Sequence, residues 1–396
     1  MKDHLALLIS HLQSKLDQRD PSLGYIKNPV KLLSTLKHLQ TKVVGMHHIK
    51  DCIARQTFYL MDKLQKGEHS LKMLNTMLMG SSGQGKTKLA IIMAEIWTHL
   101  GFLEQAVKRK NTNNPYLSKL MSIEQDMLQL YIVFGMIILS TLYNHIVQPV
   151  YQQFGLLTTV TLLLSLGVLL YIILNHVEHE VTQMEDESPI VITSRSDFIG
   201  FYVGSTDKKT EALLMKHRGK VLFIDEMYSL WSGPQDFGSE ALASLNRFLS
   251  EHPDEIVVIG AGYEEALNET VFKVQPGLKR RFMWSWTIEN YDAQELFDIF
   301  QLQLEKEQYQ LNPYDVDDIQ ECIAEHDYLF INQAGDTEKL AFYAQLNHTM
   351  TNNDKKINLH DVKQGLKELN KNNKTITDKQ SNPDMSKLKD LMKQLM

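Results

Sequence analysis

The chain has 396 residues, of which 43% are apolar and 22% are charged, a composition typical of a folded protein with about two or three domains. Its formal net charge of −7 provides no overall basic field, which argues against nucleic acid as the main partner. Its two cysteines, Cys52 and Cys322, lie far apart in the sequence, which argues against a disulfide framework and favours a reducing compartment.

Helical patterns open the chain. Leucines at helical spacing predict a first helix from Leu5 to Leu16, Asp20-Pro21 breaks it, and a second helix follows near 31–39. We interpret residues 1–40 as a helical segment that packs on its neighbour. A third amphipathic helix, from Ile49 to about Leu64, leads to the next strand. The N-terminal apolar run is too short for a secretory signal peptide.

A glycine-rich loop, residues 80–87 (GSSGQGKT), joins an apolar run at 73–79 to an amphipathic helix. The spacing G-x-x-x-x-G-K-[ST] between a strand and a helix predicts a phosphate-binding P-loop rather than an ordinary turn, because backbone N–H groups and the helix N-terminus then face the phosphates. We expect Lys86 to reach the terminal phosphates of ATP and Thr87 to bind Mg²⁺. The loop residues expected to bind nucleotide are Gly80, Ser81, Ser82, Gly83, Gln84, Gly85, Lys86 and Thr87.

A long insertion, residues 104–187, follows the P-loop helix. No Asp, Glu, Lys or Arg occurs from Met127 to Leu174. Two apolar segments there, 127–147 and 154–174, are each close to the ~20 residues that span a bilayer as a helix. Basic residues before the first segment predict that both flanks are cytoplasmic. The sequence thus predicts a multi-pass membrane protein with two spans and cytoplasmic termini; a buried helical hairpin is the alternative.

A second chemical motif follows the insertion. Four apolar residues, 221–224, run directly into Asp225 and Glu226, which is typical of a buried parallel strand with acids at its carboxyl end, where ligands bind. With a P-loop upstream, we expect Asp225 to hold Mg²⁺ and Glu226 to activate the attacking water. A solvated acidic turn is the alternative. Strands near 190–192 and 256–259 alternate with helices and predict an α/β fold with a parallel sheet.

The last part of the chain is predominantly helical. A rigid turn first presents three cations together at 279–281. From Asp292, which forms a capping box with Glu295, the pattern is helical to about residue 369 and predicts a separate all-α lid over 292–370. A tail rich in Lys and Asn, 371–396, follows and is expected to be mobile.

Taken together, these motifs resemble the AAA+ ATPases, most closely the CbxX/CfqX branch that includes SpoVK-like and EccA-like proteins and red-type Rubisco activases. The resemblance is carried by residues 195–206 (RSDFIGFYVGST), 221–231 (VLFIDEMYSLW), Ala261-Gly262-Tyr263 and 276–282 (PGLKRRF). It covers about residues 40–100 and 188–370. The two core parts of the domain would then be residues 41–103 and 188–291, on either side of the insertion.

The resemblance implies a five-stranded αβα core, a helical lid and assembly into a ring, with six subunits expected. It places the adenine of ATP near Val44 and Gly45. It also identifies Arg281 as the arginine finger that reaches a neighbouring subunit's site, with Arg280 as the alternative. The residues that would grip a substrate polypeptide in the ring pore are Tyr202, Val203 and Gly204.

Two departures from the branch affect the expected activity. Gly262 and Tyr263 stand where AAA+ proteins commonly carry an asparagine sensor, and residues 332–338 (NQAGDTE) lack the arginines of the branch's lid. The expected function is a membrane-anchored ATPase that couples MgATP hydrolysis to remodelling or threading of a protein client, with Lys86, Glu226 and Arg281 as catalytic residues. The departures favour the alternative, an ATP-gated membrane scaffold or assembly factor with little turnover.

Overall fold

The computed structural model describes residues 3–103 and 188–381, except 201, 203, 234, 235, 352 and 353. The helices are α1 His4–Asp17, α2 Pro29–Lys42, α3 His47–Gln65, α4 Lys86–Leu100, α9 Arg195–Phe198, α10 Ser205–Lys216, α11 Gly238–Glu251, α12 Glu264–Glu269, α13 Val271–Val274, α14 Ala293–Lys306, α15 Val316–Glu325, α16 Ala334–Thr351 and α17 Leu359–Ser381. The strands are β1 Thr76–Met79, β2 Ile190–Thr193, β3 Val221–Ile224, β4 Val257–Gly262, β5 Trp284–Thr287, β6 Gln310–Leu311 and β7 Lys356–Ile357.

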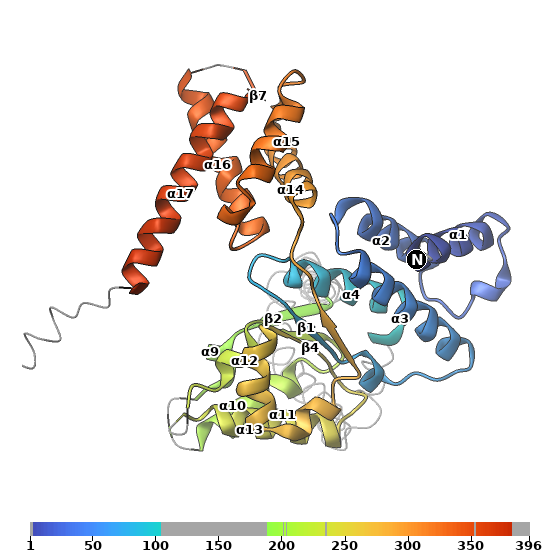
Figure 1. Ribbon diagram of the computed structural model, residues 1–396. Helices are drawn as coiled ribbons and strands as arrows, with labels where there is room; N and C mark the ends of the chain where they lie inside the picture. Colours follow the sequence, from blue (N-terminus) through green and yellow to red (C-terminus); the bar gives the residue numbers. More distant parts are fainter. Residues whose placement is uncertain are drawn as a thin grey trace, which may run out of the picture. The chain divides into compact units, whose positions relative to one another are not determined.

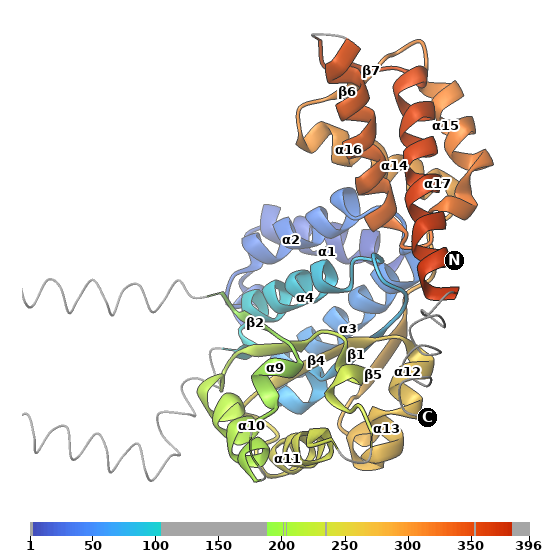
Figure 2. The same ribbon diagram turned by 90° about the vertical axis from the view of Figure 1, so that its left-hand side faces the viewer.

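Within the described residues, five strands form one parallel sheet in the order β2-β3-β4-β1-β5, which confirms the predicted α/β architecture. Each residue of β3 is buried, because both faces of this interior strand are covered; this explains its unbroken apolar run. In both views, α10, α11 and α13 lie on one side of the sheet and α4 lies on the other (Figures 1 and 2).

The strand before the P-loop is shorter than the apolar run predicts. Leu71–Leu74 form a 3-10 turn, and β1 begins only at Thr76. Between them, Asn75 is buried and joins the two neighbouring strands. Its side-chain Oδ1 accepts a hydrogen bond from the Val258 backbone N–H at 2.8 Å, and its carbonyl accepts one from the Met283 N–H at 3.1 Å. A buried amide can occupy this position because its polar groups are paired.

The N-terminal helices form as predicted, with boundaries set by capping residues. Asp3 accepts a hydrogen bond from the Ala6 N–H at the start of α1, and Asn28 accepts one from the Lys31 N–H at the start of α2. Because Pro29 suits the first helical position, α2 begins two residues before the predicted segment. The two helices pack on α3 and α4, so residues 1–40 extend the helical layer on that side of the sheet.

The C-terminal helices α14–α17 pack around their own apolar core, which includes Phe300, Ile323 and Leu340. The predicted capping box of Asp292 and Glu295 is present at the start of α14. The lid is not all-α, however, because β6 and β7 pair in parallel within it. In addition, α17 continues to Ser381, past the boundary expected at residue 370.

The membrane localisation predicted from the sequence needs correction. A membrane-spanning helix needs about 20 consecutive apolar residues, whereas the longest described helices, α3 and α17, alternate apolar residues with charged ones. In the described parts of the chain, no helix is both long and apolar enough to cross a bilayer. The predicted spans, 127–147 and 154–174, lie outside the described residues. The prediction of a two-span membrane protein is therefore dropped.

Candidate functional site

The P-loop follows β1 and opens α4, as the sequence predicts. Lys86 is the first residue of α4, and its ammonium group donates hydrogen bonds to the carbonyls of Gly80 at 3.0 Å and Ser81 at 2.6 Å. Burial lowers the pKa of Lys86, while the negative charges of Asp225 and Glu226 oppose this shift. The lysine is thus held above its own loop, close to both acids.

The two acids follow β3 at the same edge of the sheet as the P-loop, because parallel strands end together there. The Asp225 backbone N–H donates to the Thr193 carbonyl at 3.2 Å, and the Glu226 N–H donates to the Asp225 Oδ1 at 3.0 Å. One cavity of about 420 Å³ is lined by Lys86, Thr87, Asp225 and Glu226. The structure therefore brings the four predicted chemical residues together.

Two tyrosines belong to this cavity, and sequence reasoning assigned no role to either of them. Tyr228 is hydrogen-bonded to Glu226; burial, followed by the charge and hydrogen bond of Glu226, raises the pKa of Tyr228 to about 12. Its ring centroid lies 5.7 Å from that of Tyr263, and the Lys86 Nζ lies 5.8 Å from the Tyr263 ring. Cation–π attraction adds to the forces on the lysine. For Tyr263 the available signal was its place at the expected sensor position after β4, and for Tyr228 it was its closeness to the acids that follow β3.

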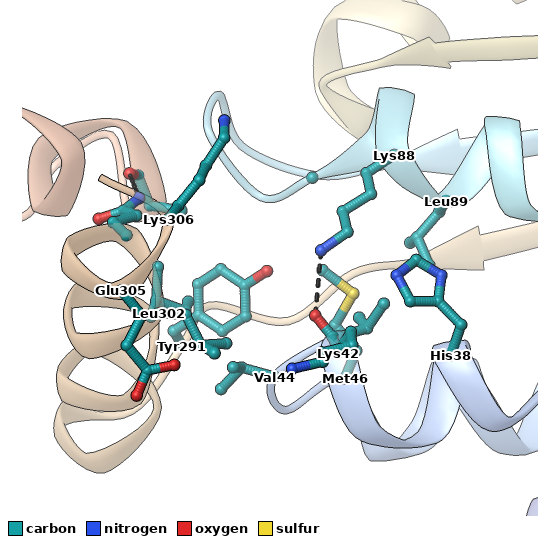
Figure 3. A pocket seen from close by; sticks show the side chains of 15 residues that line it. His38, Lys42, Val44, Met46, Lys88, Leu89, Tyr291, Leu302, Glu305 and Lys306 are labelled. Carbon is teal, nitrogen blue, oxygen red and sulfur yellow. Dashed lines mark hydrogen bonds between the residues drawn. The ribbon is translucent and has the colours of Figure 1, made fainter. Parts of the chain in front are cut away.

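A larger cavity of about 760 Å³ adjoins the P-loop at Gly85 (Figure 3). Val44, the residue predicted to lie near the adenine, lines this cavity, as do His38 and Lys42 of α2. The Lys88 ammonium donates to the Lys42 carbonyl at 3.0 Å (Figure 3). The N-terminal helical segment therefore supplies part of the wall, which sequence reasoning missed because α2 is far from the P-loop in sequence. The remaining wall comes from the segment between α2 and α3, the start of α4, the hinge and the lid.

Gly45 is the other residue predicted to lie near the adenine. The absence of a side chain at this position lets the first turn of α14 pack closely against the backbone. Its φ is +58°, and a Cβ at this position would lie 2.2 Å from the Glu295 Oε1. A side chain at residue 45 would therefore collide with the first turn of α14 and adopt a strained backbone. Gly45 permits the contact between the chain entering α3 and the start of the lid.

The lid also touches the P-loop directly. Gly83 has φ +75°, and a Cβ there would lie 2.0 Å from the Asn332 carbonyl oxygen. Ser82 and Gly85 line the 420 Å³ cavity together with Gly83, whereas the Gln84 side chain is buried and donates from Nε2 to the Asn290 Oδ1 at 2.6 Å. The lid residues that line this cavity are Gln303, Ala334, Gly335 and Glu338.

The remaining predicted residues lie elsewhere. Arg280 ends a 3-10 turn before β5 and is exposed, and Arg281, which follows it, is partly buried; neither lines the two cavities described above. Tyr202 has 79% of its surface exposed, and Gly204 precedes α10 with φ +74°. Val203 lies outside the described residues.

The smaller cavity offers too few protein ligands to hold a divalent cation by themselves. A cation there would also need phosphate oxygens as ligands. Among the described residues, no group of three or more His, Cys, Asp or Glu side chains could hold a metal ion alone. Thr87 and Asp225 offer a hydroxyl and a carboxylate in the same cavity. Mg²⁺ prefers such hard oxygen ligands and is commonly held by one or two protein groups plus phosphates and water.

Residues 173–284 match the ATPase family associated with various cellular activities (AAA). A cfxQ-like protein of Acanthamoeba polyphaga mimivirus is 24% identical over 342 residues, 84% of this chain and 64% of that protein. CbbX of Cereibacter sphaeroides is 36% identical over 126 residues, 31% of this chain and 40% of CbbX. The FIGL-1 AAA domain in complex with ADP has TM-score 0.47 and 16% identity, covering 87% of this chain and 86% of that domain. The chain spans less than two thirds of both curated relatives.

Proposed function

We propose that this chain, which contains an AAA ATPase domain, binds and hydrolyses MgATP and uses the cycle to remodel a protein client. The observation that carries the proposal is the single cavity lined by Lys86, Thr87, Asp225 and Glu226. A cation at the head of a helix and two carboxylates at a parallel strand end are the groups that phosphoryl transfer to water requires. The similarity to the cfxQ-like protein and to CbbX supports placing this chain near the CbxX/CfqX branch.

The roles follow from the contacts of each residue. Thr87 and Asp225 would hold Mg²⁺, which when bound neutralises charge on the terminal phosphates. The Lys86 ammonium exchanges the carbonyls of Gly80 and Ser81 for phosphate oxygens. Glu226, whose carboxylate is hydrogen-bonded by Tyr228, orients the attacking water and accepts its proton. Tyr228 therefore acts as a positioning residue for Glu226.

The base of the nucleotide occupies the 760 Å³ cavity beside Gly85 in this proposal. Its apolar lining, which includes Val44, Leu89 and Ile299, suits a flat heteroaromatic ring. The cavity meets the P-loop at Gly85, so a base there and phosphates at Lys86 belong to one molecule. This arrangement supports the predicted adenine position near Val44; Gly45, next to it in the chain, does not line the cavity.

Ring assembly supplies the remaining catalytic group. Arg281, or Arg280 next to it, lines neither cavity of its own subunit, so it is free to act on a neighbour's site. The exposed Tyr202 then contacts an unfolded segment of the client. A large exposed aromatic side chain at a loop tip suits a non-specific grip on polypeptide.

The replacement Glu226→Gln tests the function. We expect loss of ATP turnover of at least about a hundredfold with ATP binding retained, because the amide keeps the shape but accepts no proton. Phosphate release and equilibrium binding measure the two effects. The same variant traps the client, and we expect crosslinks from a photoreactive group at Tyr202. Retained hydrolysis in Glu226→Gln would show that Glu226 does not activate the water. A client that crosslinks to other positions but not to position 202 would show that Tyr202 does not contact it.

An ATP-gated assembly factor with little turnover is the second candidate, supported by one observation. The 420 Å³ cavity, called the phosphate cavity from here on, is lined by four described lid residues. One of them, Glu338, carries a carboxylate, and none of them carries a positive charge. Such a lid stabilises the charge of phosphoryl transfer less than a basic one would. ATP turnover per assembled subunit distinguishes the candidates: less than about one event per hour with stable ATP-dependent assembly would favour the scaffold.

A further inference from the structure

Tyr291 lies in the hinge between β5 and α14. It contacts the P-loop and the lid, and it lines the 760 Å³ cavity, called the base cavity from here on. Its ring lines the 760 Å³ cavity, with its hydroxyl group directed towards the P-loop side (Figure 3). The hydroxyl donates to the Gln84 carbonyl at 3.4 Å, and the backbone N–H donates to the Gln333 Oε1 at 2.9 Å. The ring also packs against the apolar core of the lid.

The contacts of Tyr291 differ in strength. Its hydroxyl bond to Gln84 is long, at 3.4 Å, whereas the adjacent Asn290 is held to the Gln84 Nε2 at 2.6 Å. Burial, with a smaller contribution from Glu295, raises the pKa of Tyr291, so the hydroxyl keeps its proton and remains a donor at neutral pH. A ligand packed on the ring can therefore break the long bond while the rest of the hinge stays attached to the P-loop.

At the phosphate end of the site, no comparable lid contact with the nucleotide is available among the described lining residues. A ligand moves a two-state element only if it interacts differently with the two states. The described lid residues facing the phosphate cavity are Gln303, Ala334, Gly335 and Glu338, and none carries a positive charge. A terminal phosphate thus gains no attraction to a charged lid side chain when the lid closes. A base in the adjoining cavity contacts Tyr291, whose backbone is bonded to Gln333 of the lid.

We propose that Tyr291 transmits occupancy of the base cavity to the lid, so that the lid responds to the base of a nucleotide and not to its terminal phosphate. The inference rests on the proposed function, since it requires a nucleotide in this site. It follows that ADP and ATP move the lid to the same extent. Binding and release of a nucleotide, rather than hydrolysis itself, then set the lid position.

Hydrogen–deuterium exchange of the full chain tests this inference. We use Glu226→Gln to prevent turnover and compare ADP, ATP and adenosine, each at saturation, over residues 290–306 and 333–340. We expect ADP and ATP to give equal protection, within about 20% of each other, and adenosine to give most of it. Adding Tyr291→Phe removes the hydroxyl and keeps the ring, so the nucleotide-induced protection, compared at saturating ADP, falls at least about fivefold.

Tyr328→Phe is the matched control, because Tyr328 is an exposed lid tyrosine that stacks on His326 and lines neither cavity. It should leave the protection unchanged. Protection by ATP well beyond that by ADP, or full protection in Tyr291→Phe, would overturn the inference while leaving nucleotide binding intact. Failure of the parent chain to bind any of the nucleotides would overturn both the inference and the proposed function.

Discussion

Glu338 places a negative charge in the phosphate cavity from the lid side. The same cavity holds Asp225 and Glu226, while Lys86 and Lys88 are the cations among its lining residues. Two unit charges a few ångströms apart near a protein surface interact by about 1–4 kcal/mol, depending on solvent screening. The lid side chain in this cavity therefore offers a polyphosphate no attraction, and replacing it with a cation should have an effect that depends on the charge of the ligand.

We expect Glu338→Arg to raise the affinity for ATP about tenfold at low ionic strength, because a cation that attracts the phosphates then replaces the carboxylate. Isothermal titration of ATP and of adenosine measures this, and adenosine affinity should stay within about twofold. Glu321→Arg, an exposed charge reversal on α15 outside the cavity, is the control. An equal gain for adenosine would show that the substitution acts by some route other than phosphate charge.

At the scale of elements, the lid depends on a buried histidine between two acids. His348 in α16 is 1% exposed; its Nδ1 lies 2.8 Å from the Asp361 Oδ2, and its Nε2 lies 2.7 Å from the Asp354 Oδ1. Burial lowers the pKa of His348, but the hydrogen bonds to Asp361 and Asp354 outweigh this and raise it overall. The protonated ring donates to both acids and so joins α16 to α17.

The raised pKa predicts a pH-dependent lid. The folded state binds the proton more tightly than the unfolded state, so this stabilisation is fully present below the ordinary histidine pKa of about 6.5 and is lost as pH rises through the higher folded value. Hydrogen exchange of α16 and α17, corrected for intrinsic rates, should therefore show opening that becomes easier above about pH 6.5. Equal corrected opening free energies at pH 6 and pH 9 would contradict the prediction.

Two variants separate this effect from other titrations. His348→Gln leaves the buried Asp361 without its ion-pair partner and should destabilise the lid by about 3 kcal/mol at pH 6. His360→Gln removes an exposed histidine next to Asp361 and should preserve the pH dependence. A comparable loss of lid protection in both variants would argue against a specific role for His348.

For the whole molecule, the proposed ring raises the question of which subunit completes each proposed nucleotide site. The P-loop and the acids come together within one chain, whereas Arg280 and Arg281 line neither cavity of that chain. If a neighbouring subunit supplies the arginine, a subunit that lacks the arginine and a subunit that lacks the acid can together restore ATP turnover. An arginine acting within its own chain could not be restored in this way.

We expect Arg281→Ala and Glu226→Gln each to abolish turnover alone and to recover it when mixed in equal amounts, because some interfaces then pair an intact Glu226 with an intact Arg281. Phosphate release at concentrations where the ring forms measures this recovery. Arg280→Ala should keep most activity. Loss of activity in Arg280→Ala but not in Arg281→Ala would transfer the role to Arg280, and an inactive mixture would remove action between subunits.

Local patterns in the sequence were sufficient for the motifs. The P-loop between β1 and α4, the acids after β3 and the capping box at Asp292 all form as predicted, because each depends on residues adjacent in the chain. Boundaries were less secure: β1 starts at Thr76 because Asn75 bonds to strands distant in sequence. The predicted membrane localisation was wrong, because none of the described helices is long and apolar enough to cross a bilayer.

The sequence by itself determined that this protein has a P-loop and a strand-end acid pair on a parallel α/β sheet. Only the tertiary structure decided what surrounds them: His38 and Lys42 in the base cavity, Tyr228 on Glu226, and Tyr291 joining the P-loop to the lid. The physical reason is that a motif encodes contacts within one strand, loop and helix, whereas a cavity wall is assembled from elements that only folding brings together.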